Sequence, residues 1–148
     1  MSARAMAVLV LALAAAGCRS FDPERRALTS SHPAVRTSTG VLFEDLLRGR
    51  GTPAEAGDAL LLDYVVRLET GEVVDSTIDR GVPVLVVLGE AFVRGLDDGL
   101  IGMASGGRRK ITVPPELAYG DAGVPGLVPP RSTLLFEVHA IEVRPKRP

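Results

Sequence analysis

Polar and apolar residues alternate most regularly between residues 60 and 68, where every even-numbered position is apolar or aromatic and Asp63 and Arg67 hold odd positions. An alternation of period two predicts a strand with one buried face. The next four residues, 69–72, include Gly71, whose freedom to adopt positive φ suits a hairpin turn. Val73 and Val74 would then begin the returning strand.

Segments 41–47, 83–88, 108–113 and 133–143 are rich in β-forming residues and predict further strands. The period changes between residues 92 and 103, where the apolar residues share one helical stripe, which is made of Phe92, Leu96, Leu100 and Met103. Gly95 and Gly99 lower the helix propensity of this segment, so the helix should be short and held by packing.

Two sets of charged residues are interpreted as solvent-facing: Asp97 and Asp98 beside the helical stripe, and the run 108–110 on its strand. A loop rich in proline and glycine, 114–131, separates the last two strands. An antiparallel sheet of about five strands with one short helix on a face defines an α+β fold.

Composition narrows the classes of function. The 148 residues carry 17 Lys and Arg against 18 Asp and Glu, so the net charge of −1 argues against a nucleic-acid-binding protein. Aromatic residues make up 4% of the chain and Trp is absent, so aliphatic side chains must fill the core. One Cys and two His exclude a disulfide framework and a zinc site built by this chain alone. The sequence predicts neither a metal nor a cofactor.

The first 17 residues have the pattern of a secretory signal peptide, with Arg4 followed by an uncharged stretch from Ala5 to Gly17. This stretch is too short to cross a bilayer of about 30 Å as a helix. Small residues lie directly before Cys18, the only cysteine, and resemble a bacterial lipobox, in which the thiol receives a lipid. The open alternative is a secreted, soluble protein with an incidental cysteine.

We therefore divide the chain into a signal peptide at 1–17, a flexible tether at 18–37 and a folded domain at 38–148. Arg19 follows Cys18 where sorting to the inner membrane would favour Asp, so resemblance to lipoprotein sorting rules predicts an outer-membrane anchor with the domain facing the periplasm.

Several segments resemble, in order and spacing, the FKBP-type peptidyl-prolyl cis-trans isomerases. The longest are ELAYGDAGVPGLVPP at 116–130 and STLLFEV at 132–138. Asp63-Tyr64-Val65, Val74-Asp75-Ser76, FVRGL at 92–96 and GRRKI at 107–111 extend the resemblance over about residues 39–143. The resemblance implies a strongly bent sheet wrapped around one helix. It also implies proline-containing polypeptides as substrates. No inserted domain or dimerisation arm is evident, which predicts a monomer.

The resemblance implies a catalytic group with a hydroxyl donor, a carboxylate and buried rings, namely Tyr64, Asp75, Tyr119 and Phe136. Tyr119 would donate to the substrate carbonyl, the main-chain N–H of Val93 would hold the peptide, and Tyr64 or Arg80 would orient Asp75. The implied substrate-binding residues are Val74, Arg80, Val84, Val86, Phe92, Val93, Leu96, Val124, Leu127 and Val128. Without the motifs, both tyrosines could be ordinary core residues and Asp75 could merely end a strand.

Three positions depart from the family pattern. The family commonly has aromatic rings where this chain has Val74 and Val84, and Trp where it has Leu96. Aliphatic replacements keep a pocket dry but make it shallower, so modest turnover and weak binding of macrolide inhibitors are expected. Two functions stay open: an isomerase that assists folding of cell-envelope proteins, and a tethered module that binds proline-containing peptides with little turnover.

Overall fold

The computed structural model describes residues 32–147. The predicted signal peptide, Cys18 and most of the predicted tether lie outside the described residues. The last tether residues are described, and Val35–Arg36 forms the short strand β1, paired with β2. The sheet therefore starts before the boundary at residue 38. No helix within residues 32–147 is long and apolar enough to cross a membrane.

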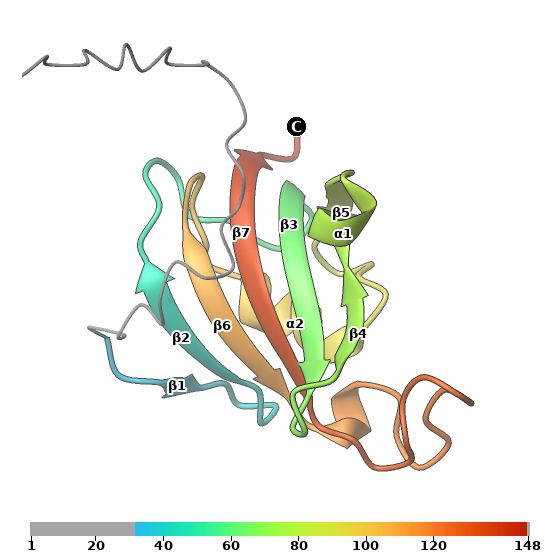
Figure 1. The fold of residues 1–148 in the computed structure, drawn as a ribbon. Helices are drawn as coiled ribbons and strands as arrows, with labels where there is room; N and C mark the ends of the chain where they lie inside the picture. Colours follow the sequence, from blue (N-terminus) through green and yellow to red (C-terminus); the bar gives the residue numbers. More distant parts are fainter. Residues whose placement is uncertain (1–31, 148) are drawn as a thin grey trace, which may run out of the picture.

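Seven strands form one antiparallel sheet in the order β1-β2-β6-β7-β3-β4, with β5 paired to β3 beside β4 (Figure 1). The later strands are β2 (Leu42–Leu47), β3 (Ala59–Leu68), β4 (Val73–Ser76), β5 (Val84–Val87), β6 (Arg108–Val113) and β7 (Leu134–Arg144). Three short helices complete the domain: α1 (Thr77–Arg80), α2 (Arg94–Leu100) and the 3₁₀ turn η1 (Pro115–Leu117). The α+β class is confirmed, with more strands than the predicted five.

The core lies between the sheet and α2, which crosses behind β6, β7 and β3 in Figure 1. The predicted alternation on β3 is confirmed: Leu60, Leu62, Tyr64, Val66 and Leu68 are all buried. Two glycines let the helix come close to β6, because a Cβ on Gly95 would lie 2.4 Å from Val113 Cγ1 and one on Gly99 2.4 Å from Ile111 Cγ2. These glycines therefore serve packing, although they weaken the helix itself.

The helix is shorter than the sequence predicted. It begins at Arg94 and ends at Leu100, so Phe92 belongs to the preceding loop and is 49% exposed. The stripe prediction failed at its ends because Val93 is the N-cap, in extended conformation, and Ile101 ends the helix with φ −54° and ψ 135°. Of the four stripe residues, Leu96 and Leu100 are helical and fully buried.

The interpretation of Arg109 as an outward residue is wrong. Arg109 alternates onto the inner face of β6 and its side chain is 5% exposed. Its guanidinium donates to Asp45 at 2.7 Å and to the carbonyls of Gly99 and Ile101 at 2.8 Å each, and it lies over the Phe43 ring. A buried cation thus binds the carbonyls at the C-terminal end of α2, where the helix dipole favours positive charge.

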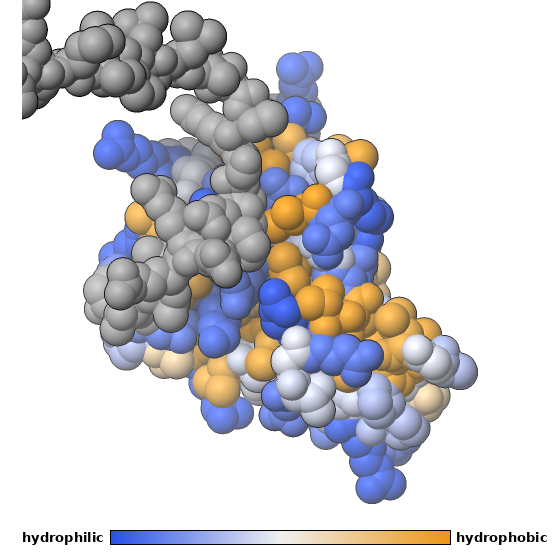
Figure 2. Space-filling view, in the orientation of Figure 1, coloured by the Kyte–Doolittle hydropathy of each residue, from blue (hydrophilic) through white to orange (hydrophobic). Residues whose placement is uncertain are grey.

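Apolar surface gathers in Figure 2 where β4 begins and where the loop after η1 lies. Val73 of β4 and Leu127 of that loop are exposed apolar residues of these segments. Exposed apolar groups that gather in one place often mark a binding surface, which directs attention to this end of the sheet.

Candidate functional site

Three aromatic rings from distant parts of the chain meet at the inner face of the sheet. Tyr64 comes from β3, Phe136 from β7, and Phe92 from the loop before α2. Their centroids are 5.6 Å apart for Tyr64 and Phe92, 6.1 Å for Tyr64 and Phe136, and 6.4 Å for Phe92 and Phe136. Tyr64 and Phe136 are buried, whereas half of Phe92 remains open to solvent. Phe92 is therefore the member of the cluster that is open to a ligand, and the other two rings pack behind it.

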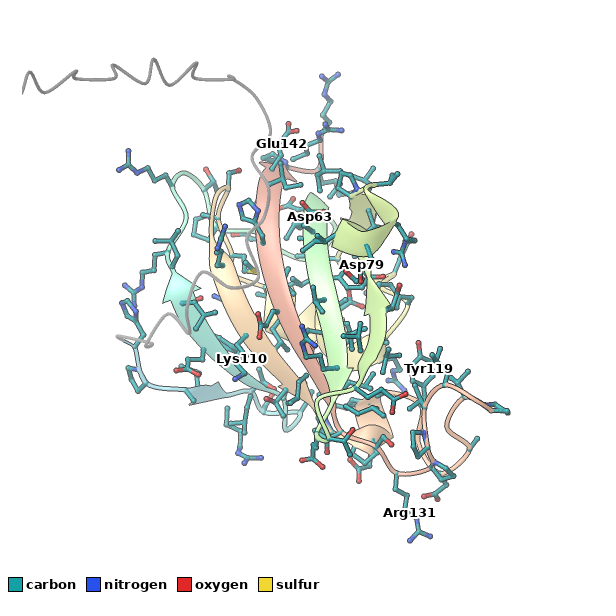
Figure 3. All side chains as sticks on the ribbon, in the orientation of Figure 1. Asp63, Asp79, Lys110, Tyr119, Arg131 and Glu142 are labelled. Atoms are coloured by element: carbon teal, nitrogen blue, oxygen red, sulfur yellow. The ribbon has the colours of Figure 1, made fainter. Side chains whose placement is uncertain are left out.

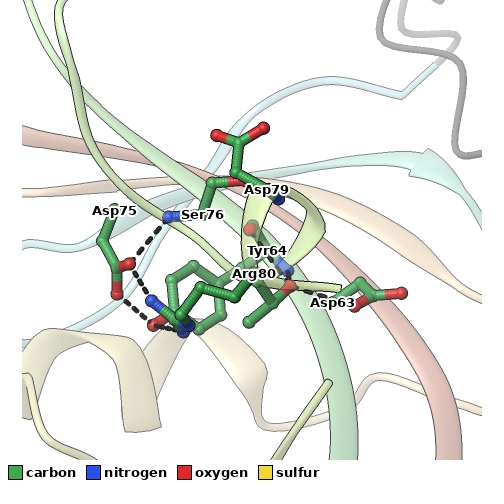
Figure 4. A network of polar contacts seen from close by, with 7 residues as sticks. Asp63, Tyr64, Asp75, Ser76, Asp79 and Arg80 are labelled. Carbon is green, nitrogen blue, oxygen red and sulfur yellow. Dashed lines mark hydrogen bonds and ion pairs between the residues drawn. The ribbon is translucent and has the colours of Figure 1, made fainter. Parts of the chain in front are cut away.

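A polar network borders this ring cluster (Figure 4). The Tyr64 hydroxyl donates to Asp75 Oδ2 at 2.6 Å, and the main-chain N–H of Ser76 donates to Asp75 Oδ1 at 2.8 Å. Arg80 forms an ion pair with Asp75 and donates to the Tyr64 hydroxyl at 3.3 Å. The sequence offered Tyr64 or Arg80 as the partner of Asp75, and the structure brings both to it.

The ionisation of Tyr64 follows from these contacts. Burial raises the pKa of its hydroxyl above the ordinary value of 10.0, and the bond to Asp75 raises it further, while Arg80 acts in the opposite direction. Tyr64 therefore stays protonated at neutral pH. The Tyr64 hydroxyl already donates a hydrogen bond to Asp75. It therefore positions the carboxylate and is not a free donor for a ligand.

The short helix α1, which the sequence analysis missed, positions Arg80. Ser76 is its N-cap and accepts from the N–H of Asp79 at 3.1 Å, and Gly81 ends it with φ 70°. Ser76 followed by an acidic residue three positions later, and then a glycine, is a capping pattern that could have predicted this turn. Because α1 is one turn long, Arg80 lies close enough to reach back to Asp75.

Thr77 is a positioning residue that sequence reasoning also missed. Its side chain is fully buried, and its hydroxyl accepts from the N–H of Tyr64 at 2.9 Å and donates to Asp63 Oδ1 at 2.9 Å. It therefore joins α1 to β3 at the residue that carries the site tyrosine. Nothing in its sequence surroundings distinguishes Thr77 from an ordinary helical threonine.

Val93 contributes a main-chain group. The residue is 2% exposed and is the N-cap of α2. Within residues 32–147 its N–H has no hydrogen-bond partner. A buried N–H without a partner is costly, and a ligand carbonyl would satisfy it. That the Val93 N–H holds a peptide stays a prediction.

The predicted aliphatic residues lie at different depths. Val86, Leu96 and Val128 are buried members of the core that also contains Tyr64 and Phe136. Val74, Val84 and Val124 are partly buried and pack against that core. Leu96 has no exposed surface, so it belongs to the core and does not form an open floor.

The loop after η1 carries Tyr119, which is 36% exposed and lies at the end of the sheet where β4 begins (Figure 3). Within the described part of the chain, its hydroxyl makes no hydrogen bond and its ring does not contact the three-ring cluster. Its donor is therefore free, unlike that of Tyr64. Leu127 of the same loop is 48% exposed.

This loop is closed on itself. The N–H of Arg131 donates to the carbonyl of Gly120 at 2.9 Å, and Val124 pairs with Val128 in an isolated bridge. Gly123 has φ 59°, and a Cβ there would lie 2.3 Å from the carbonyl oxygen of Val128. Only glycine fits this turn, which places Val124 against the core while Leu127 stays exposed.

A cavity of about 280 Å³ lies elsewhere in the domain, between the loop after β2 and the loop after α2. Arg48, Gly51, Met103 and Arg109 are among its lining residues, and no predicted site residue lines it. We place the site at the ring cluster rather than at this cavity, because the exposed Phe92 ring and the Val93 N–H without a partner among the described residues are there.

Comparison with known proteins identifies the family. The family model described as FKBP-type peptidyl-prolyl cis-trans isomerase matches residues 51–141. This chain belongs to the FKBP-type peptidyl-prolyl cis-trans isomerases. An FK506-binding protein of Neisseria meningitidis serogroup B is 41% identical over 105 residues, which cover 70% of this chain and 96% of that relative. FK506-binding protein 4 of Emericella nidulans is 39% identical over 117 residues, which cover 78% of this chain but only 24% of the fungal protein.

Solved FKBP structures share the fold. FkpA from Escherichia coli superposes with a TM-score of 0.70 at 37% identity. The match covers 76% of this chain and 52% of FkpA. AtFKBP13 gives a TM-score of 0.67 at 36% identity, over 74% of this chain and 97% of AtFKBP13. The family and the enzyme class are therefore established, and the reaction is rotation about the peptide bond that precedes proline.

Proposed function

We propose that this chain is a lipid-anchored FKBP-type isomerase that accelerates X-Pro rotation in proline-containing polypeptides of the cell envelope. It would act as a monomer on the outer membrane, with the domain from residue 38 onward facing the periplasm. The observation that carries the catalytic part is the fixed Asp75 carboxylate beside an open aromatic face. The cellular part rests on the signal-peptide pattern and on Cys18, both outside the described residues.

The reaction sets modest chemical demands. Partial double-bond character gives the peptide bond a rotation barrier of about 18–20 kcal/mol. Uncatalysed X-Pro isomerisation takes ~10–100 s, so raising a rate of ~0.01 s⁻¹ to ~100 s⁻¹ requires about 5.5 kcal/mol. No covalent bond is made or broken, so no nucleophile is needed. The enzyme needs only to bind the twisted amide better than the planar one.

We assign the residues as follows. The proline ring packs against the exposed Phe92 ring, behind which the buried rings of Tyr64 and Phe136 lie, and this dry surface disfavours the polar planar amide. The N–H of Val93 and the hydroxyl of Tyr119 donate to substrate carbonyls. Asp75 lies beside the rotating carbonyl, and the exposed Leu127 contacts the residue before proline.

A protease-coupled assay on an X-Pro tetrapeptide with the full-length chain tests the catalytic assignment. Asp75→Val and Tyr119→Phe should each lower kcat/KM, while Arg131→Gln, which alters an exposed ion pair on the same loop, should leave it unchanged. Peptide binding without acceleration would instead select the binding module, the second candidate, which the aliphatic residues Val74, Val84 and Leu96 favour.

A separate experiment tests the anchor. In a diderm bacterial host, the wild-type chain should incorporate radiolabelled palmitate and fractionate with the outer membrane. Cys18→Ala should abolish both behaviours. An unlabelled wild-type chain in the soluble periplasmic fraction would select the secreted alternative and leave the isomerase assignment intact.

A further inference from the structure

The loop between β5 and α2, residues 88–93, is tied to the helix behind it by one carboxylate. Asp97 Oδ1 accepts from the N–H of Gly89 at 2.9 Å, and Asp97 Oδ2 accepts from the N–H of Ala91 at 3.3 Å. The sequence analysis placed Asp97 on a solvent-facing side of the helix; the structure shows it partly buried, with two hydrogen bonds that the sequence did not predict. Both of its carboxylate oxygens therefore bind main-chain groups of the preceding loop, at Gly89 and Ala91.

This loop delivers two groups to the site. Phe92 directly follows Ala91 and is the partly exposed member of the ring cluster, and Val93 supplies the N–H without a partner. The strand-borne rings are fixed by ladder pairing, since Tyr64 and Phe136 lie on the adjacent strands β3 and β7. Phe92 has no ladder to fix it.

Other restraints on the loop act on either side of Phe92, and after it the N–H of Leu96 donates to the carbonyl of Val93 at 2.9 Å. The N–H of Gly57 donates to the carbonyl of Leu88 at 2.9 Å, and the N–H of Glu90 donates to that of Val87 at 3.0 Å. Val93, the N-cap, offers no side-chain hydrogen bond to the start of α2. The bond from Asp97 to Ala91 is therefore the polar contact nearest to Phe92 on its N-terminal side.

We propose that Asp97 is a positioning residue for X-Pro isomerisation: its carboxylate sets the place of the Phe92 ring against Tyr64 and Phe136. This inference rests on the proposed role of the ring cluster in binding proline. Loss of the carboxylate would leave two loop N–H groups unpaired and let the ring move from the cluster. Substrate affinity would then fall more than the rate of rotation once substrate is bound.

The neighbouring aspartate provides a matched control. Asp98 lies in the same turn of α2 but accepts from the hydroxyl of Thr39 at 2.7 Å, in the turn before β2. Asp98→Ala removes the same charge from the same helix and breaks one contact with a different loop. Asp97→Glu keeps both carboxylate oxygens one methylene further out.

The first test is steady-state isomerisation by the full-length chain, with urea unfolding alongside. Loss of a hydrogen bond that holds the ring should raise KM by about five- to tenfold in Asp97→Ala, with kcat changed less than about twofold. Asp98→Ala should leave both constants unchanged. In Asp97→Glu, KM should rise less than in Asp97→Ala. Equal effects in Asp97→Ala and Asp98→Ala would overturn the proposal, because helix charge would then explain the result.

A double-mutant cycle identifies the route of the effect. In a Phe92→Ala background, Asp97→Ala should change KM less than about twofold, because the ring that it positions is gone. If the two substitutions multiply fully, Asp97 does not act through Phe92.

An NMR measurement stands apart from activity. The nuclear Overhauser effects that link the Phe92 ring to Tyr64 and Phe136 should weaken in Asp97→Ala and persist in Asp98→Ala. Unchanged effects in Asp97→Ala would sink the inference whatever the enzyme does. Weakened effects in a chain that shows no turnover would support the positioning role and count against the proposed function alone.

Discussion

The two sides of the site are built by different means. Tyr64 and Phe136 lie on β3 and β7, which pair continuously from Ala59 to Leu68 apart from one irregularity, and both side chains are buried. Phe92, Tyr119 and Leu127 lie on loops, and each is partly exposed. The sheet-borne side is fixed by register and core packing, so its substitutions should cost stability. The loop-borne side is fixed by a few local contacts, so its substitutions should mainly change activity.

The largest expected effect is on the sheet-borne side. Phe136→Ala removes a fully buried ring and should lower the free energy of unfolding by about 3–5 kcal/mol. Urea denaturation of the full-length chain measures this loss. Leu135→Ala, on the opposite face of the same strand, should cost much less. A loss below about 1 kcal/mol for Phe136→Ala would contradict the idea that this side belongs to the core.

The next prediction concerns two glycines of the loop after η1, one with positive φ and a close carbonyl and one with positive φ alone. Gly123→Ala forces a side chain into the left-handed region, at a cost of about 1–2 kcal/mol, and also against the Val128 carbonyl. Gly126→Ala, at φ 75° with nothing within 4 Å of its Cβ, meets the strain alone. We expect Gly123→Ala to reduce kcat/KM clearly more than Gly126→Ala. Equal activities would mean that the close turn at Gly123 does not shape the site.

The two tyrosines give a smaller and more specific contrast. Tyr64→Phe breaks the bonds to Asp75 and Arg80 and should lower both kcat/KM and the free energy of unfolding, the latter by about 1 kcal/mol. Tyr119→Phe removes a hydroxyl with no partner among the described residues, so stability should stay the same while kcat/KM falls about tenfold, equivalent to ~1.4 kcal/mol. A stability loss in Tyr119→Phe would place that hydroxyl in the fold.

The smallest effect concerns pH and the outer face of the sheet. His139 of β7 lies across from Asp63 of β3 and Arg108 of β6. Burial lowers the pKa of His139 below 6.5, the charge of Arg108 lowers it further, and Asp63 opposes the shift. The unfolded chain then binds the proton more readily than the folded one. The free energy of unfolding should therefore decrease as pH falls through about 6.5.

Unfolding in urea at pH 7.5 and 5.5 tests this effect. The change in stability of the wild-type chain between the two pH values should be smaller than the effect of Tyr64→Phe, and His139→Gln should reduce it. An identical change in His139→Gln would assign the pH dependence to other groups.

Sequence patterns predicted the strands well because their period is local. The alternation at 60–68 is sufficient to place Tyr64 on the buried face, and the motif around Tyr119 marks the loop. The helix was predicted too long because a stripe of apolar residues does not reveal that Phe92 lies in a loop and Met103 beyond the helix end. The turn α1 was missed although Ser76, Asp79 and Gly81 form a capping pattern.

The interpretation of one charged residue was wrong and that of another was incomplete, for a shared reason. Arg109 and Asp97 were read as solvent-facing because charged side chains usually are. Arg109 is instead buried against the carbonyls of Gly99 and Ile101, and Asp97 accepts from Gly89 and Ala91. Asp97 has main-chain partners and Arg109 has two as well, beside the Asp45 carboxylate and the Phe43 ring; every residue has main-chain groups, so no residue type in the sequence marks those partners.

The sequence by itself determined the fold class, the family and the chemical types of the site residues, because hydrophobic period and motif spacing are written along the chain. Only the tertiary structure decided that Asp75 is held by Tyr64 and Arg80 together, that Phe92 joins the strand-borne rings, and that Asp97 ties down the loop before it. These contacts join residues by distance and direction in space, to which main-chain groups and sheet register contribute as much as the side chains themselves.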